Sequence, residues 1–417
     1  MATNPSGKIL LRMCKMSGYE MQYINEAFAD EWVVPLGPNV SGFEKELSEF
    51  LGENKYPVAL SSGTAALHLG LIGLGVAEGD EVMVQSMTFS ASVNPVRYVG
   101  AVPVMVDSEP GSWNMDAALL DAAIADRVKK TGRKPAAIVM VCLYGMPADY
   151  DGIMEVAAKW DIPVLEDAAE AFGSSYRGQR CGTFGRFGVL SFNGNKMITT
   201  SGGGALVCPD EESARKTMYF ATQSRLGYAY YQHKDIGYNY RMSNICAGIG
   251  RGQMKVAEDY IAHHRHRQAY YREHLKGVDG ITLHENPDSR YDSNFWLCTI
   301  LLDSDLKIKG MENAYAETIN GTVGGAGGVT EKGDSIRTDC EPNANVEAMR
   351  LGLAAKGIES RPLWKPMHRQ PVFEGFPAYT NGVSEDLFHR GLCIPSGPYV
   401  SDEDADCVIA TIKSLIE

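Results

Sequence analysis

Short apolar runs alternate with helical patterns from about residue 56 to residue 210. Five runs have the length and composition of buried strands, at 56–60, 81–84, 102–107, 137–142 and 162–167. Buried strands that alternate with helices predict an α/β fold, in which a largely parallel sheet has helices on both faces. Ligands bind beyond the carboxyl ends of such strands. Candidate chemistry is therefore expected at 62–65, 86–90, 144–145, 167 and 191–196.

The second half of the chain predicts a smaller domain. A long amphipathic segment at about 245–275 is expected to lead from a large domain, 1–270, into a small carboxyl-terminal domain, 271–417. The small domain is expected to contain a strand at 295–302, a helix at 343–354 and, between them, a glycine-rich insertion at about 303–342. A connection of this length is typical of a flap or a mobile insertion.

Composition narrows the class of protein. The 417 residues are 44% hydrophobic and 22% charged, which is globular. The net charge of −13 makes nucleic acid an unsuitable partner. Nine cysteines without a C-x-x-C pair indicate a reducing cytoplasm. Charge interrupts the amino terminus, and no apolar stretch reaches about 18 residues, so we expect neither a signal peptide nor a membrane span.

Three other patterns have ordinary explanations. The glycine spacing of 173–178 resembles a nucleotide-binding loop, but Gln179 stands where the lysine is needed. The glycines at 70–75 have reversed dinucleotide-binding spacing and lie in a helical pattern. The cluster His263-His264-Arg265-His266 has no acidic or cysteine ligand at helical spacing, so we interpret it as a solvated basic face and predict no metal site.

The segment Ser61-Ser-Gly-Thr-Ala is a turn of small residues between a predicted strand and a predicted helix. Free N–H groups at a helix amino terminus can bind phosphate, and Thr64 adds a hydroxyl. The alternative is a plain helix cap, in which Ser62 or Thr64 satisfies these donors. The segment alone does not distinguish the two.

Asp167 and Lys196 complete a candidate active site. Asp167 ends one apolar run. Lys196 follows a second apolar run and lies among small and apolar residues. A lysine, a carboxylate and a phosphate site at one sheet edge are what a pyridoxal phosphate enzyme requires, because the lysine binds the aldehyde and the carboxylate keeps the pyridine nitrogen protonated. Taken singly, Lys196 could be an exposed loop residue and Asp167 a helix cap.

Several motifs also carry a family resemblance, in order along nearly the whole chain: Ser61-Ser-Gly-Thr-Ala, Gly79-Asp-Glu-Val, Met87-Thr-Phe-Ser-Ala, Glu166-Asp-Ala-Ala-Glu, Ser191-Phe-Asn-Gly-Asn-Lys, Gly202-Gly-Gly-Ala, Gly237-Tyr-Asn-Tyr-Arg-Met and Lys365-Pro-Met-His. The chain resembles the DegT/DnrJ/EryC sugar aminotransferases. The resemblance implies the aspartate aminotransferase architecture, fold type I, with a mostly parallel sheet and a smaller carboxyl-terminal α+β domain. It also implies pyridoxal 5′-phosphate alternating with pyridoxamine 5′-phosphate, and a homodimer with shared active sites.

The resemblance assigns expected roles residue by residue. Lys196 would bind the cofactor and move the proton, while Asp167 would pair with the pyridine nitrogen. Glu170 would lie near the ring or its phenolic oxygen, where the family often has Gln or His. The other expected cofactor contacts are stacking by Phe89, phosphate binding by Gly63, Thr64, Ala65 and Ser191, and, from the neighbouring subunit, Asn239 and Arg241. Substrate contacts are expected from Asn193, Lys365 and His368.

Within the family, the segments at 191–204, 360–371 and 391–397 are most similar to the branch that aminates C4 of a UDP-linked 4-keto-6-deoxy-N-acetylhexosamine for bacillosamine-type glycans or exopolysaccharides. L-Glutamate would be the amino donor and 2-oxoglutarate the product. The alternatives are a GDP-linked C4 sugar, a C3-keto sugar, and a non-catalytic cofactor-binding regulator. A dehydratase of the same family would carry His in place of Lys196.

Overall fold

The computed structural model describes residues 7–52, 54–315 and 340–417. Its central sheet has the strand order β1-β9-β8-β5-β4-β2-β3-β14. The strands are β1 (Tyr56–Leu60), β2 (Glu81–Gln85), β3 (Val102–Val106), β4 (Ala137–Val141), β5 (Val164–Asp167), β8 (Phe187–Ser191), β9 (Gly204–Cys208) and β14 (Ala378–Tyr379). Only β9 runs antiparallel to its neighbours. The predicted parallel sheet is therefore confirmed, with one reversed strand inserted beside β1.

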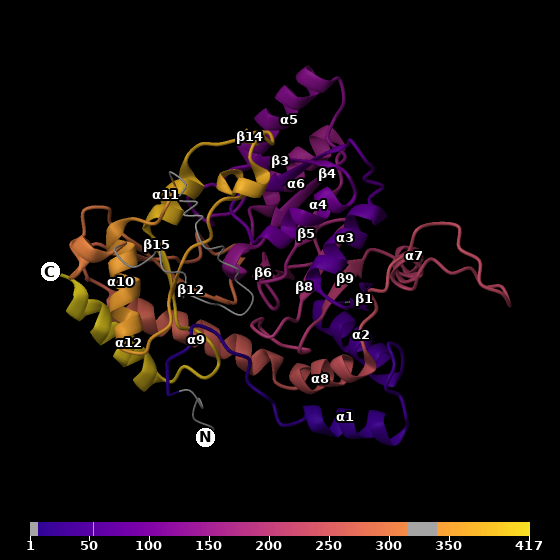
Figure 1. The fold of residues 1–417 in the computed structure, drawn as a ribbon, viewed down its shortest axis with the longest axis horizontal. Helices are drawn as coiled ribbons and strands as arrows, with labels where there is room; N and C mark the ends of the chain where they lie inside the picture. The colour runs from indigo at the N-terminus through magenta and orange to yellow at the C-terminus, as the bar shows by residue number, and fades with distance from the viewer. Residues whose placement is uncertain (1–6, 53, 316–339) are drawn as a thin grey trace.

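Helices cover both faces of this sheet, as predicted (Figure 1). Side chains alternate along a strand, so Met83 of β2 packs in one hydrophobic cluster while its neighbours Val82 and Val84 pack in the other. The first cluster includes buried residues of α2 (Pro38–Leu51), α5 (Ala117–Thr131) and α6 (Tyr150–Trp160). The second includes buried residues of α3 (Gly63–Gly73), α4 (Asn94–Tyr98) and α7 (Glu211–Ala221).

A second, antiparallel sheet lies in the carboxyl-terminal part, with the order β10-β12-β15-β13. Its strands are β10 (Ile281–Leu283), β12 (Cys298–Leu302), β13 (Arg361–Pro362) and β15 (Gly391–Ile394). It shares a core with α9 (Ala257–Leu275), α10 (Ala344–Ala355) and α12 (Asp402–Leu415). The expected domain boundary near residue 270 falls inside α9, and most of the expected insertion at 303–342 lies outside the described residues.

The remaining elements are short or connect these layers. A small third sheet pairs β11 with β6 and β6 with β7. The elements are α1 (Glu20–Ala29), α8 (Asn244–Met254), α11 (Val383–Arg390), β6 (Ser175–Tyr176), β7 (Gln179–Arg180), β11 (Tyr291–Asp292) and the 3-10 helices η1 (Ser90–Ser92), η2 (Leu143–Gly145), η3 (Met311–Asn313), η5 (Met367–Arg369) and η6 (Pro371–Phe373). Within the described ranges, no helix combines the length and apolar character needed to cross a bilayer.

Two predicted elements differ from the structure. The amphipathic segment at 245–275 is two helices, α8 and α9, separated at residues 255–256. The predicted strand at 295–302 begins only at Cys298, because Phe295 has a φ of 48°, a left-handed conformation that an extended strand does not contain.

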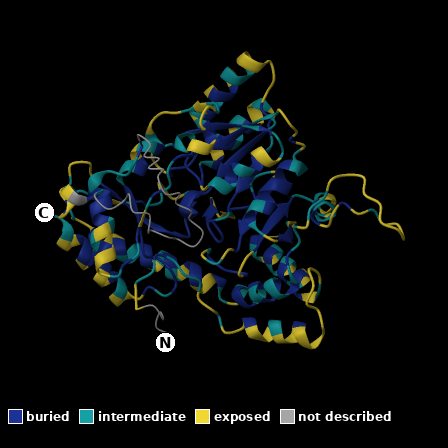
Figure 2. Cartoon of the chain, in the orientation of Figure 1, coloured by how far each residue is buried: buried dark blue, intermediate teal, exposed yellow. Residues whose placement is uncertain are grey.

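The interpretation of residues 263–266 as a solvated basic face is wrong. His264 is fully buried, whereas His266 is exposed. Figure 2 shows buried and exposed residues along the helices of this part of the chain. Burial lowers the pKa of His263 to about 4 and that of His264 well below the usual value. Helix α9 buries polar residues on its inner face, including Arg267 and Gln268. A hydropathy pattern predicts that such residues face water, whereas here Nη2 of Arg267 donates to the carbonyl of Val400 and Nε2 of Gln268 donates to the carbonyl of His284.

Candidate active site

The predicted chemistry gathers at one cavity, at the carboxyl ends of the central strands. Asp167 ends β5, Ser191 ends β8, and the turn after β1 begins at Ser61. The cavity has a volume of about 420 Å³, within the usual range for small-molecule sites. Eight of the predicted site residues line it: Gly63, Thr64, Phe89, Asp167, Glu170, Ser191, Asn193 and Lys196.

Lys196 and Glu170 form a largely buried ion pair in this cavity. The Nζ atom of Lys196 lies 3.1 Å from Oε1 of Glu170 and 4.3 Å from the centre of the Trp296 ring. The other carboxylate oxygen of Glu170 accepts a 2.8 Å hydrogen bond from the N–H of Tyr144, whose φ of 54° is left-handed. Burial raises the pKa of Glu170, and the charge of Lys196 opposes that shift. Glu170 is thus held through one oxygen by Lys196 and through the other by Tyr144. A left-handed backbone, as at Tyr144, is typical of a functional site.

Asp167 is fixed by hydroxyl and backbone donors. Ser92 donates a 2.7 Å hydrogen bond to Oδ2, and the N–H of Ala169 donates one of 3.1 Å to Oδ1. The hydroxyl of Thr88 lies 2.7 Å from that of Ser92 and extends this network. Burial raises the pKa of Asp167, while the bonds from Ser92 and Ala169 and the charge of Lys196 lower it. The carboxylate is therefore oriented, and directed hydrogen bonds stabilise its charged form.

The turn at the start of α3 is a helix cap that leaves N–H groups for the predicted phosphate. Ser62 caps the helix by accepting a 3.0 Å hydrogen bond from the N–H of Ala65. This bond uses the N–H of Ala65, and Ala65 is buried outside the cavity lining, so the structure does not place Ala65 at the predicted phosphate site. Helix geometry leaves the N–H groups of Gly63 and Thr64 without intrahelical acceptors. A Cβ on Gly63 would lie 3.0 Å from Cβ of Ser191, so this close approach favours glycine.

Aromatic side chains form one wall of the cavity, and sequence reasoning identified only Phe89 among them. Trp296 and Trp364 line it together with Phe89, whose ring centre is 5.5 Å from that of Trp364. Phe89 is 57% exposed, so its ring face is accessible for stacking. Trp364 lies inside the quoted motif at 360–371, which is a usable sequence signal. Trp296 lies in an apolar run, which gives no sequence signal for a role in the site.

Besides Ala65, four predicted residues do not line this cavity. His368 contacts the hydroxyl of Ser86 at 2.6 Å and Glu385 at 3.0 Å. Lys365 donates a 2.8 Å hydrogen bond to the carbonyl of Cys340. The other two, Asn239 and Arg241, lie near the end of the connection between α7 and α8, where Asn239 forms a β-bridge with Thr222 and Arg241 forms one with Leu60 at the end of β1.

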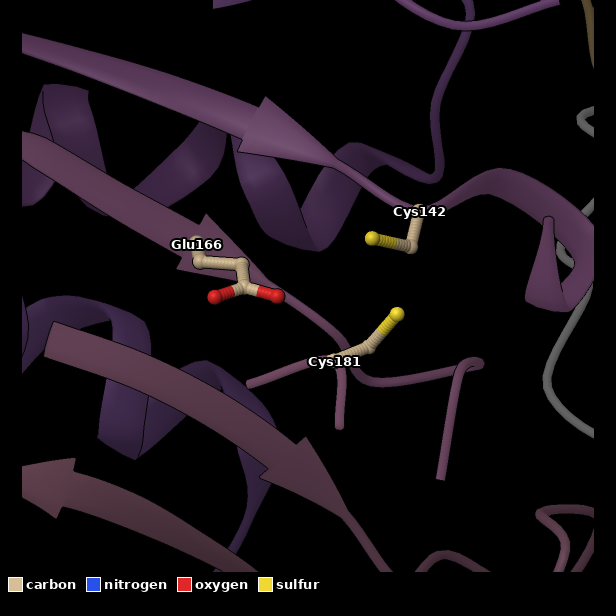
Figure 3. Close-up of side chains that lie close together, drawn as sticks. All are labelled: Cys142, Glu166 and Cys181. Carbon is tan, nitrogen blue, oxygen red and sulfur yellow. The ribbon is translucent and has the colours of Figure 1, made fainter. Parts of the chain in front are cut away.

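One further group of potential ligands lies in the core. Cys142, Glu166 and Cys181 bring three potential metal-binding atoms within 4.8 Å of one another (Figure 3). The Glu166 carboxylate, however, accepts hydrogen bonds from the Tyr150 hydroxyl and from three N–H groups of residues 182–185. Both carboxylate oxygens are occupied by donors, and two thiols alone do not make a closed zinc site. The cluster is better explained as a hydrogen-bonded part of the core.

Comparisons with known proteins agree with this geometry. The sequence pattern of the DegT/DnrJ/EryC1/StrS aminotransferase family matches residues 15–323 and 335–413. The chain is 41% identical to the Bacillus subtilis protein EpsN, provisionally described as a pyridoxal phosphate-dependent aminotransferase, over 98% of this chain and 96% of EpsN. It is 34% identical to the GDP-perosamine synthase of Escherichia coli O157:H7, over 96% of each chain.

The fold comparison gives the same result. The crystal structure of a DegT/DnrJ/EryC1/StrS aminotransferase from Brucella abortus superposes with a TM-score of 0.81, at 29% sequence identity and 95% coverage of both chains. The expected fold class is therefore confirmed.

Proposed function

Since the chain belongs to the DegT/DnrJ/EryC1/StrS aminotransferase family, we propose that it transfers the amino group of L-glutamate to C4 of a UDP-linked 4-keto-6-deoxy sugar. UDP-2-acetamido-2,6-dideoxy-hexos-4-ulose is the favoured acceptor, for bacillosamine-type glycan or exopolysaccharide synthesis. That the chain is a pyridoxal phosphate-dependent sugar aminotransferase follows from the family. The observation that carries the proposed chemistry is the contact of Lys196 with Glu170, in the cavity that also contains Asp167.

The residues of the cavity fit pyridoxal phosphate. Gly63 and Thr64 offer N–H groups for the phosphate, together with the Ser191 hydroxyl at the same edge. Asp167 offers a carboxylate for the pyridine nitrogen, and Phe89 offers a ring face for stacking. When bound, the cofactor supplies an aldehyde that reacts with amines and a ring that accepts electrons.

Lys196 is the proposed acid and base. Its Nζ takes the proton from the α-carbon of glutamate and later delivers a proton to C4 of the sugar. Glu170 holds Nζ in place through the 3.1 Å contact, and the Trp296 ring excludes water from one side of it. Asp167 would hold the pyridine nitrogen of the cofactor in its protonated form, which would let the ring accept electrons.

The acceptor sugar is proposed to bind against the aromatic wall. Phe89, Trp296 and Trp364 offer apolar surface that suits a pyranose ring and a deoxygenated C6. Asn193 lines the same cavity and is the proposed polar contact. His368 and Lys365 belong to a neighbouring polar cluster and are proposed to contact the substrate farther from the reacting carbon.

Two specific alternatives are tested together with the UDP-linked sugar. The similarity to a GDP-perosamine synthase supports a GDP-linked 4-keto sugar as the second candidate acceptor. A non-catalytic regulator would keep the cofactor site without turnover.

Incubation with glutamate and a small panel of nucleotide-linked ketosugars should yield the UDP-linked C4 amino sugar, detected by mass. We expect kcat/KM for the UDP-linked sugar to exceed that for the GDP-linked sugar by about tenfold or more, because the nucleotide contributes binding energy to the transition state. Lys196→Ala is the negative control, which is expected to form no amino sugar. A preference for GDP or for a C3-keto sugar would overturn the proposed acceptor and leave the family assignment intact, whereas no turnover with any sugar or with glutamate would favour the regulator.

We further propose that the chain forms a homodimer whose active sites are shared. Monomeric proteins seldom expose many large apolar side chains close together. Exposed apolar side chains in and around α1 are Met16, Tyr19, Met21, Phe28, Trp32, Val33, Val34 and Leu36. A second group lies in the connection after α7, at Tyr228, Tyr230, Tyr231 and Ile236.

Phe28→Asp is expected to weaken this dimer. Phe28 is 60% exposed, so a charge there leaves the isolated subunit folded but opposes an apolar interface. Sedimentation equilibrium should show dissociation at a protein concentration about tenfold higher or more than for the parent chain, with turnover falling as the dimer dissociates. Leu351→Asp, an exposed apolar site in α10, is the matched control. A fully active monomer would contradict the shared site.

No disulfide joins any of the nine cysteines, which all lie in the described ranges, and six of them are buried. A reducing compartment preserves such thiols. This supports the proposal that the enzyme acts in the cytoplasm, where nucleotide-linked sugars are available.

A further inference from the structure

The amino-terminal segment is anchored beside the second sheet and reaches the active-site lysine. Ile9 donates a 3.0 Å backbone hydrogen bond to the carbonyl of Gly357 and accepts one of 2.8 Å from the N–H of Glu359, and the N–H of Ser396 donates one of 3.1 Å to the carbonyl of Leu11. The N–H of Leu11 also donates to the Glu359 carboxylate at 3.1 Å. These contacts fix the backbone on the amino-terminal side of Arg12.

Arg12 contacts the main chain on both sides of the bond that joins Asn195 to Lys196. Its Nε donates to the carbonyl of Asn195 at 3.2 Å, and Nη2 donates to the carbonyl of Lys196 at 2.5 Å. Trp296 donates from Nε1 to the same Asn195 carbonyl at 2.8 Å. The remaining Arg12 nitrogen, Nη1, contacts Nε2 of His264. A rigid guanidinium fork can hold several acceptors in fixed geometry, which a lysine cannot.

The contact with Arg12 settles the tautomer of His264. Arginine only donates, so Nε2 of His264 accepts, and its proton lies on Nδ1. Nδ1 then donates to the carbonyl of Phe295 at 3.2 Å, directly before Trp296. Burial keeps this imidazole neutral by lowering its pKa. His264 therefore links Arg12 to the segment that places the Trp296 ring over Nζ of Lys196.

In the described part of the chain, the side chain of Arg12 contacts two carbonyls and His264 and forms no ion pair with a carboxylate. Burial lowers the pKa of its guanidinium to about 9. A half-buried cation without a counter-ion is costly. The donors of Arg12 bind the carbonyls of residues 195 and 196 and the ring of His264. The burial of this cation therefore serves to hold the backbone beside Lys196.

We propose that Arg12 and His264 are positioning residues for Lys196: they fix the backbone at residues 195–196, so that Nζ returns to the same place after each proton transfer. The inference rests on the proposed role of Lys196. Small errors in the position of a reacting group reduce rates strongly, even when binding is unaffected.

The test uses full-length holoenzyme and three variants. His264→Leu cannot accept from Arg12, and Arg12→Met cannot donate to either carbonyl. His264→Gln can do both jobs of the imidazole, because its amide oxygen accepts and its NH₂ group donates. His266→Leu, on the exposed side of the same helix, is the matched control. The measured quantities are the rate at which glutamate bleaches the visible band of the lysine-bound cofactor in a single turnover, KM for glutamate, and the melting temperature of cofactor-free protein.

His264→Leu and Arg12→Met should each slow the bleaching by about ten- to a hundredfold per bound cofactor, which is the effect of losing one charge-assisted hydrogen bond. KM for glutamate should stay within about twofold. His264→Gln should recover most of the rate, and His266→Leu should match the parent chain.

A lower melting temperature with an unchanged bleaching rate in both loss variants would show a merely structural role and overturn the inference. The proposed function would fail differently, because the parent chain itself would then lack a glutamate-dependent change of the band.

Discussion

Lys196→Ala is expected to abolish amino transfer, with turnover falling by about 10⁴-fold or more, because the proposed base and covalent attachment point are the same atom. Turnover is measured with glutamate and the UDP-linked ketosugar. The variant should also lose the visible band of a lysine-bound cofactor. Lys134→Ala removes an exposed lysine that pairs with Asp161 and should behave as the parent chain. Turnover near the parental value in Lys196→Ala would contradict the proposed role.

Asp167→Asn should have the second largest effect, a loss of about 10²- to 10³-fold in turnover, because it removes a preorganised charge from the proposed position of the pyridine nitrogen. Cofactor content, measured after release by denaturation, should change little, since the phosphate site at Gly63 and Thr64 and the stacking surface of Phe89 persist. Near-parental turnover with cofactor bound would show that Asp167 does not act on the ring.

Ser92→Ala supplies the pH signature of the same carboxylate. The Ser92 hydrogen bond lowers the pKa of Asp167, so its removal raises that pKa further. As the pH falls, Asp167 then becomes protonated earlier, and the acid limb of the turnover profile moves to higher pH. If the acid limb of the turnover profile stays at the same pH in Ser92→Ala, protonation of Asp167 does not determine that limb.

The strands and the principal site residues could be predicted because each depends on a local signal. The apolar run at 56–60 is β1, and that at 137–142 contains β4. Asp167 and Ser191 stand at strand ends, where parallel topology brings side chains together regardless of their distance in sequence. Periodicity identifies the strands, and topology then places the residues that follow them.

The order of strands could not be predicted in the same way. Strand β9 inserts antiparallel between β1 and β8, where a Cβ on Gly204 would lie 2.4 Å from the N atom of Gly63. This pairing depends on close packing of two glycine-containing segments more than a hundred residues apart. The hydrophobic pattern of a sequence does not indicate which distant segments pack this closely. The pairing of β14 with β3 is equally remote in sequence.

Arg12, His264 and Trp296 were missed for a related reason. Each is an ordinary residue in its local sequence, and each gains its role from partners more than thirty residues away or from a left-handed turn at Phe295. His264 in particular was interpreted from its neighbours in sequence, which are half-buried or exposed. Its own burial depends on hydrogen bonds to Arg12 and to Phe295.

The most direct measurement is to reduce the holoenzyme with borohydride, digest it and locate the cofactor by mass spectrometry. Reduction makes the link between a lysine and the cofactor permanent, so the modified peptide identifies the attachment point. The predicted result is one cofactor per chain, on the peptide that contains Lys196 and on no other. Stoichiometric modification of a different lysine, with Lys196 unmodified in protein that still aminates a ketosugar, would contradict the assignment of this cavity as the active site.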